Sequence, residues 1–424
     1  MFLFLAFQDW IHQTVLFKFL LSCYHFIFTT NRHFIFTTNH DLILPNEIIT
    51  AILLRLPTKS LLKCMCVSKS WHQLISSPDF VNTHLKLNKH HRVLFSGIFE
   101  NIKFCSLPPL FNKQQLTQEL FHMDPPCSPP FFVGSVNGLI CLFNRRRDTY
   151  IWNPTIRKSK KLPKSSWGTS CYTKYGFGFD DSRDDYKVLF IDHCGNSYNG
   201  ELSNTRVVVN IYSSRTDSWT TLHDQLQGIF LLNYSGKFIN GKIYWAASTG
   251  IHDCNVRNII SFDVADETWG SLELPICGEE VFNIKLGVVE NDLSVLYTCK
   301  PGTTSDVWIL KDCRVNVSWM KWFTIEYPQY AVLYRFDSPI FTFFIHLRES
   351  DKDNILLLIP EKIMIFDGST KKLEHEATVK ECNTAEIYAE SIVNPLTIPY
   401  YGCSNLGEVE VNVEHSSVLV ECMD

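Results

Sequence analysis

A tryptophan recurs at intervals of 50 residues in the second half of the chain, at Trp219, Trp269 and Trp319. The first two each stand seven positions after an aromatic residue, Tyr212 and Phe262, that closes a run of β-branched and aromatic residues. Looser copies of the pattern lie at residues 150–154 and 363–367. A unit of about 50 residues with a strand, a turn and a tryptophan has the size of one four-stranded β-propeller blade. The repeat therefore predicts a propeller of five or six blades.

The sequence around these repeats predicts a mainly β fold. Between residues 90 and 400, short aromatic and β-branched runs alternate with Asn, Gly, Asp and Ser, the pattern of strands joined by tight turns. We assign residues 130–400 to an irregular, kelch-like β-propeller, although the double glycine typical of kelch repeats is absent. Residues 88–129 are expected to be a linker or the start of the β domain, and residues 401–424 a C-terminal tail.

A helical periodicity precedes the β region. Apolar residues between positions 48 and 56 follow the spacing of an amphipathic helix. Pro45 can open this helix, and Pro57 ends it. Thr58 can cap a second helix, and Ser68 can cap a third that Pro78 stops. Residues 41–87 are therefore expected to form a small α head of three helices.

So small a unit cannot bury all of its apolar surface, which indicates that the head docks onto another protein. Its motifs are Leu44-Pro45-Asn46-Glu47-Ile48, Ile52-Leu53-Leu54-Arg55-Leu56-Pro57-Thr58-Lys59-Ser60-Leu61-Leu62, Val67-Ser68-Lys69-Ser70-Trp71 and Leu74-Ile75-Ser76-Ser77-Pro78-Asp79-Phe80. They closely resemble the F-box of plant F-box proteins. This resemblance implies that the head binds the small acidic Skp-type adaptor of a cullin–RING ubiquitin ligase, the SCF complex.

The resemblance also implies which residues form the F-box core and its adaptor-facing surface. They are Leu44, Pro45, Ile48, Leu53, Leu56, Pro57, Leu61, Leu62, Val67 and Trp71. Cys64, Cys66 and His72 differ from the residues that relatives often carry at these positions. These differences alter the local charge but leave the apolar pattern intact.

Motifs in the β region resemble the F-box-associated and kelch-type C-terminal region of the same plant family. They are Asn137-Gly138-Leu139-Ile140-Cys141, Ile151-Trp152-Asn153-Pro154-Thr155, Tyr175-Gly176-Phe177-Gly178-Phe179-Asp180, Tyr186-Lys187-Val188 and Tyr388-Ala389-Glu390-Ser391-Ile392. The implied function is that of a substrate-recognition adaptor of an SCF ubiquitin ligase. The F-box would bind a Skp-type adaptor, and through it a cullin, while the propeller would bind a protein substrate. The alternative is a stand-alone propeller interaction module with an idle or regulatory F-box.

The sequence gives little sign of catalysis. Gly176-x-Gly178 lacks the third glycine and the following helix of a dinucleotide loop, and we expect a tight β-bend there. No nucleophile elbow, zinc-protease motif or Walker A sequence is present. The chain is therefore expected not to be an enzyme, and neither a cofactor nor a metal is expected.

Composition limits the partners and the compartment. A formal charge of −5 argues against a nucleic-acid binder. Fifteen cysteines without disulfide spacing indicate reduced, mostly buried thiols and a cytoplasmic and/or nuclear protein. A basic cluster comprises Arg145, Arg146, Arg147, Arg157, Lys158, Lys160, Lys161 and Lys164. We interpret it as a solvated hairpin, with a nuclear-import patch or a dock for an acidic segment as alternatives.

The first 40 residues are interpreted as an N-terminal extension without a folded role, unstructured or artefactual. Residues 1–28 are apolar, but Asp9 and Lys18 interrupt them, and the longest uncharged run, 19–31, has 13 residues. A membrane-spanning helix needs about 20. Residues 25–32 are then repeated almost unchanged as residues 33–40. A weak membrane anchor and a secretory signal are the alternatives, and no membrane role is expected.

Overall fold

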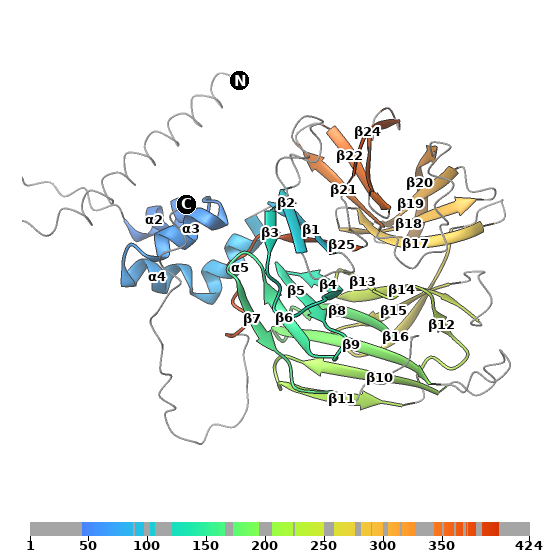
Figure 1. Ribbon diagram of the computed structural model, residues 1–424, viewed down its shortest axis with the longest axis horizontal. Helices are drawn as coiled ribbons and strands as arrows, with labels where there is room; N and C mark the ends of the chain where they lie inside the picture. The colour runs from blue at the N-terminus through green and yellow to red at the C-terminus, as the bar shows by residue number, and fades with distance from the viewer. Residues whose placement is uncertain are drawn as a thin grey trace, which may run out of the picture.

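The computed structural model shows a helical head beside a β-propeller (Figure 1). It describes residues 45–87, 90–96, 102–106, 121–165, 173–194, 206–223, 225–249, 258–275, 281–289, 291–299, 304–313, 316–326, 343–349, 352–359, 362–367, 370, 372–378 and 384–397. The expected N-terminal extension and C-terminal tail lie outside these residues. None of the helices in this part of the chain has the length and apolar character needed to cross a membrane.

The head has four helices where the sequence predicted three. They are α2 (Asn46–Leu53), α3 (Thr58–Met65), α4 (Lys69–Ile75) and α5 (Pro78–Leu87). Ser68 caps α4 as predicted, and its Oγ accepts a hydrogen bond from the Trp71 backbone N–H at 3.1 Å. Thr58 is no cap, because it is already the first residue of α3 and Pro57 holds the cap position. Pro78 begins α5 instead of only ending α4, since the first position of a helix needs no backbone N–H.

The described strands form five sheets. The first contains β1 (His91–Ser96), β2 (Ile102–Ser106), β3 (Phe121–Met123) and β25 (Thr384–Ala389), and the second β4 (Phe131–Val136), β5 (Leu139–Phe143), β6 (Thr149–Asn153) and β7 (Lys158–Lys161). The third contains β8 (Lys174–Asp180), β9 (Asp185–Cys194), β10 (Arg206–Ser213) and β11 (Ser218–Leu222), and the fourth β12 (Phe230–Leu231), β13 (Lys237–Ile239), β14 (Lys242–Ser248), β15 (Asn258–Asp263) and β16 (Trp269–Glu273). The fifth contains β17 (Val281–Val289), β18 (Asp292–Cys299), β19 (Thr304–Cys313), β20 (Asn316–Glu326), β21 (Phe343–Glu349), β22 (Lys352–Ile359), β23 (Lys362–Asp367) and β24 (Leu373–Thr378).

This arrangement confirms the prediction of a mainly β chain with an irregular propeller of five or six blades. The eight-stranded sheet consists of two four-stranded antiparallel meanders, β17–β20 and β21–β24. Among the described strands, these two meanders are joined only by a short parallel pairing of β17 with β21. The ring closes in the first sheet, where β25 pairs with β1 and lies beside β4. Residues 88–129, expected to be a linker or the start of the β domain, thus contribute three strands of the closing blade.

Two of the repeated tryptophans, Trp219 and Trp319, connect neighbouring blades through hydrogen bonds. Trp219 lies directly opposite Tyr212 across the β10–β11 hairpin, and Trp269 opposite Phe262 across β15–β16. The Trp219 Nε1–H donates to the Pro163 carbonyl at 2.8 Å, just beyond the outer strand of the preceding sheet. Trp319 repeats this bond, with Nε1 at 2.8 Å from a carbonyl oxygen at the end of β16. Each of these two indoles therefore packs within its own blade and hydrogen-bonds to the previous one.

The prediction of a tight β-bend at Gly176-x-Gly178 was wrong, because both glycines lie inside β8. A Cβ atom on Gly176 would lie 2.8 Å from the Trp245 ring, and one on Gly178 would lie 2.7 Å from a Val264 methyl group. Side chains of the next blade approach the backbone of β8 so closely that only glycine fits there. These glycines therefore serve packing between blades.

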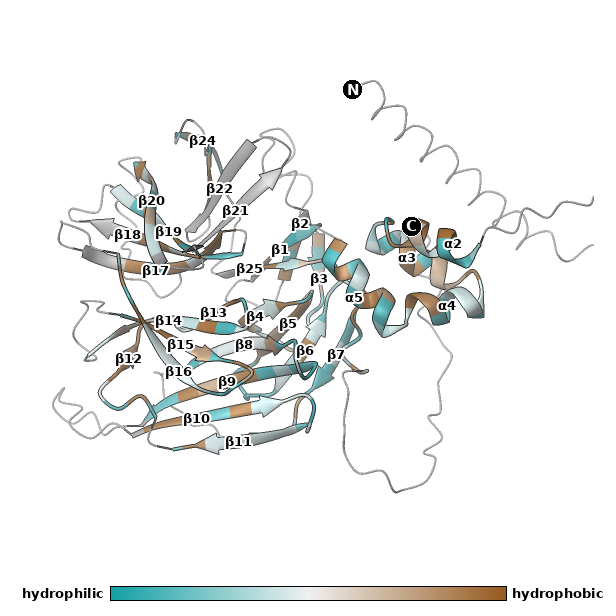
Figure 2. Ribbon diagram, turned by 180° about the vertical axis from the view of Figure 1, so that it is seen from behind, coloured by the Kyte–Doolittle hydropathy of each residue, from teal (hydrophilic) through white to brown (hydrophobic). Residues whose placement is uncertain are grey.

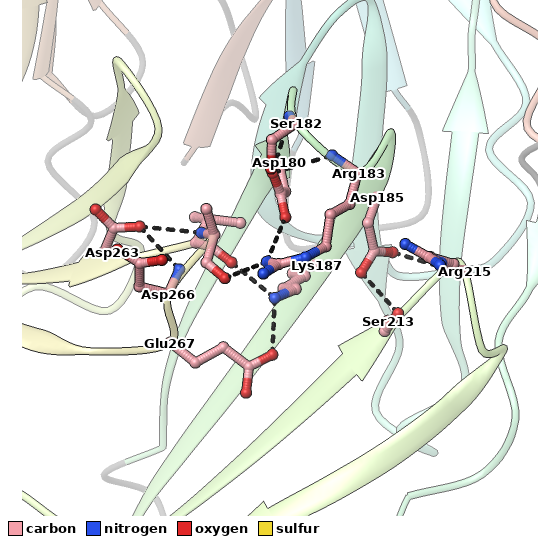
Figure 3. Close-up of polar contacts among 12 residues, drawn as sticks. Asp180, Ser182, Arg183, Asp185, Lys187, Ser213, Arg215, Asp263, Asp266 and Glu267 are labelled. Carbon is pink, nitrogen blue, oxygen red and sulfur yellow. Dashed lines mark hydrogen bonds and ion pairs between the residues drawn. The ribbon is translucent and has the colours of Figure 1, made fainter.

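Polar contacts also join neighbouring blades, at the turns after β8 and β15 (Figure 3). The Lys187 ammonium, whose side chain is only 5% exposed, donates to the Val264 carbonyl and to Glu267 Oε1, both at 2.7 Å. Arg183 donates to the Ala265 carbonyl of the same turn. A buried ammonium requires such partners because its desolvation is costly. The network therefore fixes these two turns to each other.

Candidate adaptor-binding head and its junction with the propeller

The four helices of the head enclose a small apolar core. Its buried residues are Leu53, Leu56, Leu61, Cys64, Ile75 and Phe80, together with Ile392 from the segment that follows β25. Three of the ten predicted site residues, Leu53, Leu56 and Leu61, are thus inside the head at 2%, 7% and 0% exposure. These three side chains shape the head from within.

Other predicted site residues remain at the surface of the head. The Ile48 side chain on α2 is 46% exposed, an unusual state for a large aliphatic residue, and Pro45 and Pro57 are exposed as well. Leu62, Val67 and Trp71 are half-buried. Leu44 lies outside the described residues. Ile48 and the two prolines are thus the exposed apolar set among the predicted site residues.

The helix α5 was missed in the sequence analysis. Phe80 is buried in the core of the head, and the His84 ring stacks on it with 6.3 Å between ring centroids. His84 Nε2 lies 3.0 Å from the Leu56 carbonyl oxygen, so α5 is tied to the connection between α2 and α3. His84 follows Phe80 by four positions and Leu85 follows Val81 by four, and this helical spacing is the signal that could have revealed the helix.

Acid is expected to weaken the head through His84. Burial lowers the pKa of His84 below its ordinary value of 6.5, because the charged imidazolium is poorly solvated inside the core. As the pH falls below about 6.5, the unfolded chain takes up a proton that the folded head does not. The free energy of unfolding should therefore decrease between pH 7 and pH 5, which urea unfolding at both values would measure.

The matched control for this effect is His84→Leu, which fills the site and cannot titrate. Its unfolding should depend less on pH than that of the wild type. His193, buried in the propeller with a pKa lowered to about 4, contributes equally to both proteins. An identical pH dependence in the two proteins would contradict the assignment to His84.

Three of the sequence motifs meet where the head joins the propeller. The buried Asn153 amide donates from Nδ2 to the Ser391 carbonyl at 3.0 Å and to the Val393 carbonyl at 2.8 Å. Gly138, at φ +77°, also faces this segment, and a Cβ atom there would lie 2.3 Å from Ser391 Oγ. The segment after β25 is thus held by two hairpins of the second sheet. Its next side chain, Ile392, enters the core of the head.

The same segment is anchored to the first blade. The Glu390 backbone N–H donates to the His90 carbonyl at 2.8 Å, immediately before β1. The Glu390 carboxylate forms an ion pair with Arg92, and both side chains are largely buried. The head is therefore connected to the propeller both through α5 and through the segment that contains Ile392. Its orientation relative to the propeller is fixed by both ends of the β region.

The described residues contain no group of three or more metal-ligating side chains. Their free cysteines include Cys64, Cys127 and Cys141, all buried, and the exposed Cys66. Burial raises the pKa of Cys127 to about 12 and that of Cys141 well above its ordinary value. At neutral pH these two thiols are therefore protonated and poor nucleophiles.

Family comparisons agree with this architecture. Residues 42–83 match the F-box domain, and residues 115–395 match the F-box associated beta propeller domain. The chain belongs to the F-box proteins with an F-box-associated β-propeller. F-box proteins of this kind are generally non-catalytic adaptor components, and the matches indicate no enzyme family.

Several relatives share both halves of this F-box protein. The F-box/kelch-repeat protein At3g23880 of Arabidopsis thaliana is 29% identical, and the match covers 83% of this chain and 96% of the relative. The F-box protein CPR1 of the same plant is 28% identical over 85% of this chain and 89% of its own. Among solved structures, a chain of a nidogen–laminin complex has a TM-score of 0.43 at 11% identity, covering 71% of this chain and 99% of that one. A likeness this low supports no argument about the present chain.

Proposed function

We propose that this F-box protein is a substrate receptor of an SCF cullin–RING ubiquitin ligase and is itself non-catalytic. The head would bind a Skp-type adaptor, and through it the cullin, while the propeller would bind a protein substrate. The observation that carries the proposal is the exposed apolar set around Ile48, on a head whose own core is already filled. An aliphatic side chain left at the surface of a closed core is free to be buried by a partner.

The junction supports a receptor role because it limits how the two halves can move. Ile392 and the hydrogen bonds of Asn153 connect the head to the propeller over a short path. A substrate on the propeller would then be held at a defined distance from the rest of the ligase. Ubiquitin transfer would gain from this proximity, without chemistry on this chain. The free cysteines favour a cytoplasmic and/or nuclear site of action.

Purification of the full chain from plant cells tests the proposal. We expect a Skp-type adaptor and a cullin to co-purify in stoichiometric amounts. Proximity labelling with and without proteasome inhibition should then reveal proteins that accumulate near the propeller only when degradation is blocked. A folded chain that captures propeller partners but neither adaptor nor cullin would contradict the proposal and favour a stand-alone interaction module.

A further inference from the structure

The outer edge of the second sheet is a short basic strand. β7 holds Lys158, Lys160 and Lys161 in four residues and, among the described strands, pairs only with β6. Figure 2 shows it in the hydrophilic colour. The backbone groups on its far side are not used by another described strand. An edge of this kind can accept one more strand if the charges allow it.

The other outer edges of the described sheets lack this charge. β24 holds two glutamates and no Lys or Arg, and β16 holds one glutamate and no Lys or Arg. β3 and β11 contain no acidic residue, Lys or Arg, and β20 balances one lysine against one glutamate. Electrostatic attraction would therefore direct an acidic strand to β7 in preference to these edges.

The positive charge at β7 is only partly neutralised within the blade region. Lys160 pairs with Asp217 of the next sheet at 3.0 Å, and Lys161 pairs with Asp148 at 2.9 Å. Arg157 and Lys158 are exposed, and neither forms an ion pair with another described residue. Two cations at the start of β7 are thus available to an acidic partner.

The C-terminal tail has the complementary sequence. Residues 408–414 read Glu-Val-Glu-Val-Asn-Val-Glu, and in an extended strand this alternation places three valines on one face and three glutamates on the other. Residues 401–424 contain five acidic residues and no Lys or Arg. The run therefore has the pattern of a strand with one acidic face.

The tail can also reach this edge. Val393 is hydrogen-bonded to Asn153, which pairs with Lys158 at the beginning of β7. Glu408 lies 15 positions after Val393. Because an extended chain spans about 3.3 Å per residue, this connection covers roughly 50 Å at full extension. A four-residue strand next to Lys158 lies well within that range.

We propose that residues 408–414 add to the free edge of β7 as a further strand of this blade. The glutamates then lie on the face of the sheet that carries Lys158 and Lys160, close to Arg157, and backbone hydrogen bonds extend the sheet. This contact is separate from adaptor binding by the head. The docked tail occupies the edge that an acidic, extended segment of another protein would otherwise use.

Hydrogen exchange measured on the full chain and on a chain ending at residue 400 tests the proposal. The β7 amides that do not pair with β6 should exchange about tenfold faster, or more, in the shortened protein. Arg157→Glu with Lys158→Glu should produce the same loss of protection in the full chain. Changing Glu408, Glu410 and Glu414 to Lys in that double variant should restore the protection of the β7 amides. Glu421→Lys, outside the alternating run, is the control and should have no effect.

Two results would overturn the proposal. Exchange at β7 that is unchanged by the truncation would mean that the lysines only protect a free edge from aggregation. Protection that rises with protein concentration would mean that the tail of a second copy docks there, and the intramolecular assignment would be wrong. A labelled peptide of residues 407–414, added to the shortened chain, should bind it and should not bind the Arg157→Glu/Lys158→Glu form.

Discussion

Changing Ile48 to Asp is expected to abolish binding of a Skp-type adaptor and to leave the melting temperature of the chain unchanged. The Ile48 side chain is 46% exposed on α2 and is not part of the core of the head. In the free protein the new carboxylate would remain in water. In the complex it would be desolvated against an apolar surface, which should weaken binding about a hundredfold or more. Calorimetric titration with purified adaptor and thermal unfolding of the free chain would measure the two effects.

A core change provides the matched comparison. Leu61 is fully buried in the head, so Leu61→Asp should lose both adaptor binding and the folded head. Ile48→Leu keeps the apolar surface and should bind nearly as well as the wild type. If the Ile48→Asp chain is folded and still binds the adaptor, the binding surface lies elsewhere on the head.

Which residues of the head face outward could not be read from the sequence. Helical spacing and the Ser68 cap located α2, α3 and α4 because these signals are local. Ile392 completes the core of the head from the other end of the β region, more than 300 residues after Phe80. No periodicity within the first 90 residues can indicate a contact of that range. Leu53, Leu56 and Leu61 therefore looked equivalent to Ile48 until the fold was known.

The propeller shows the same division between local and distant information. The aromatic residue and the tryptophan seven positions later are cross-strand neighbours in one hairpin, so their spacing is a local signal. Closure of the ring pairs residues 384–389 with residues 91–96, and β1 carries no tryptophan to mark it as part of a blade. The glycines of β8 were misread because their cause lies in the next blade, at Trp245 and Val264.

Trp269→Ala is expected to destabilise the propeller by about 3 kcal/mol. The indole is half-buried, with its ring centroid 4.9 Å from that of Phe262 and 6.1 Å from that of Trp245. Truncation of a large aromatic side chain in a core costs about 3–5 kcal/mol, and partial exposure places Trp269 at the lower end. The free energy of unfolding in urea would measure the loss, and adaptor binding by the head should persist in the folded variant.

Phenylalanine at the same positions separates packing from hydrogen bonding. Trp219 Nε1 donates to the Pro163 carbonyl, whereas Trp269 Nε1 is buried and has no hydrogen-bond partner among the described residues. Trp219→Phe should therefore lower the free energy of unfolding by about 1 kcal/mol more than Trp269→Phe, although both changes remove similar apolar area.

A ligand-binding role for the tryptophans would predict a different result for Trp269→Ala. A Trp269→Ala chain that unfolds like the wild type and no longer captures its protein partner would assign this indole to recognition, because a side chain that packs the core cannot be removed without a loss of stability.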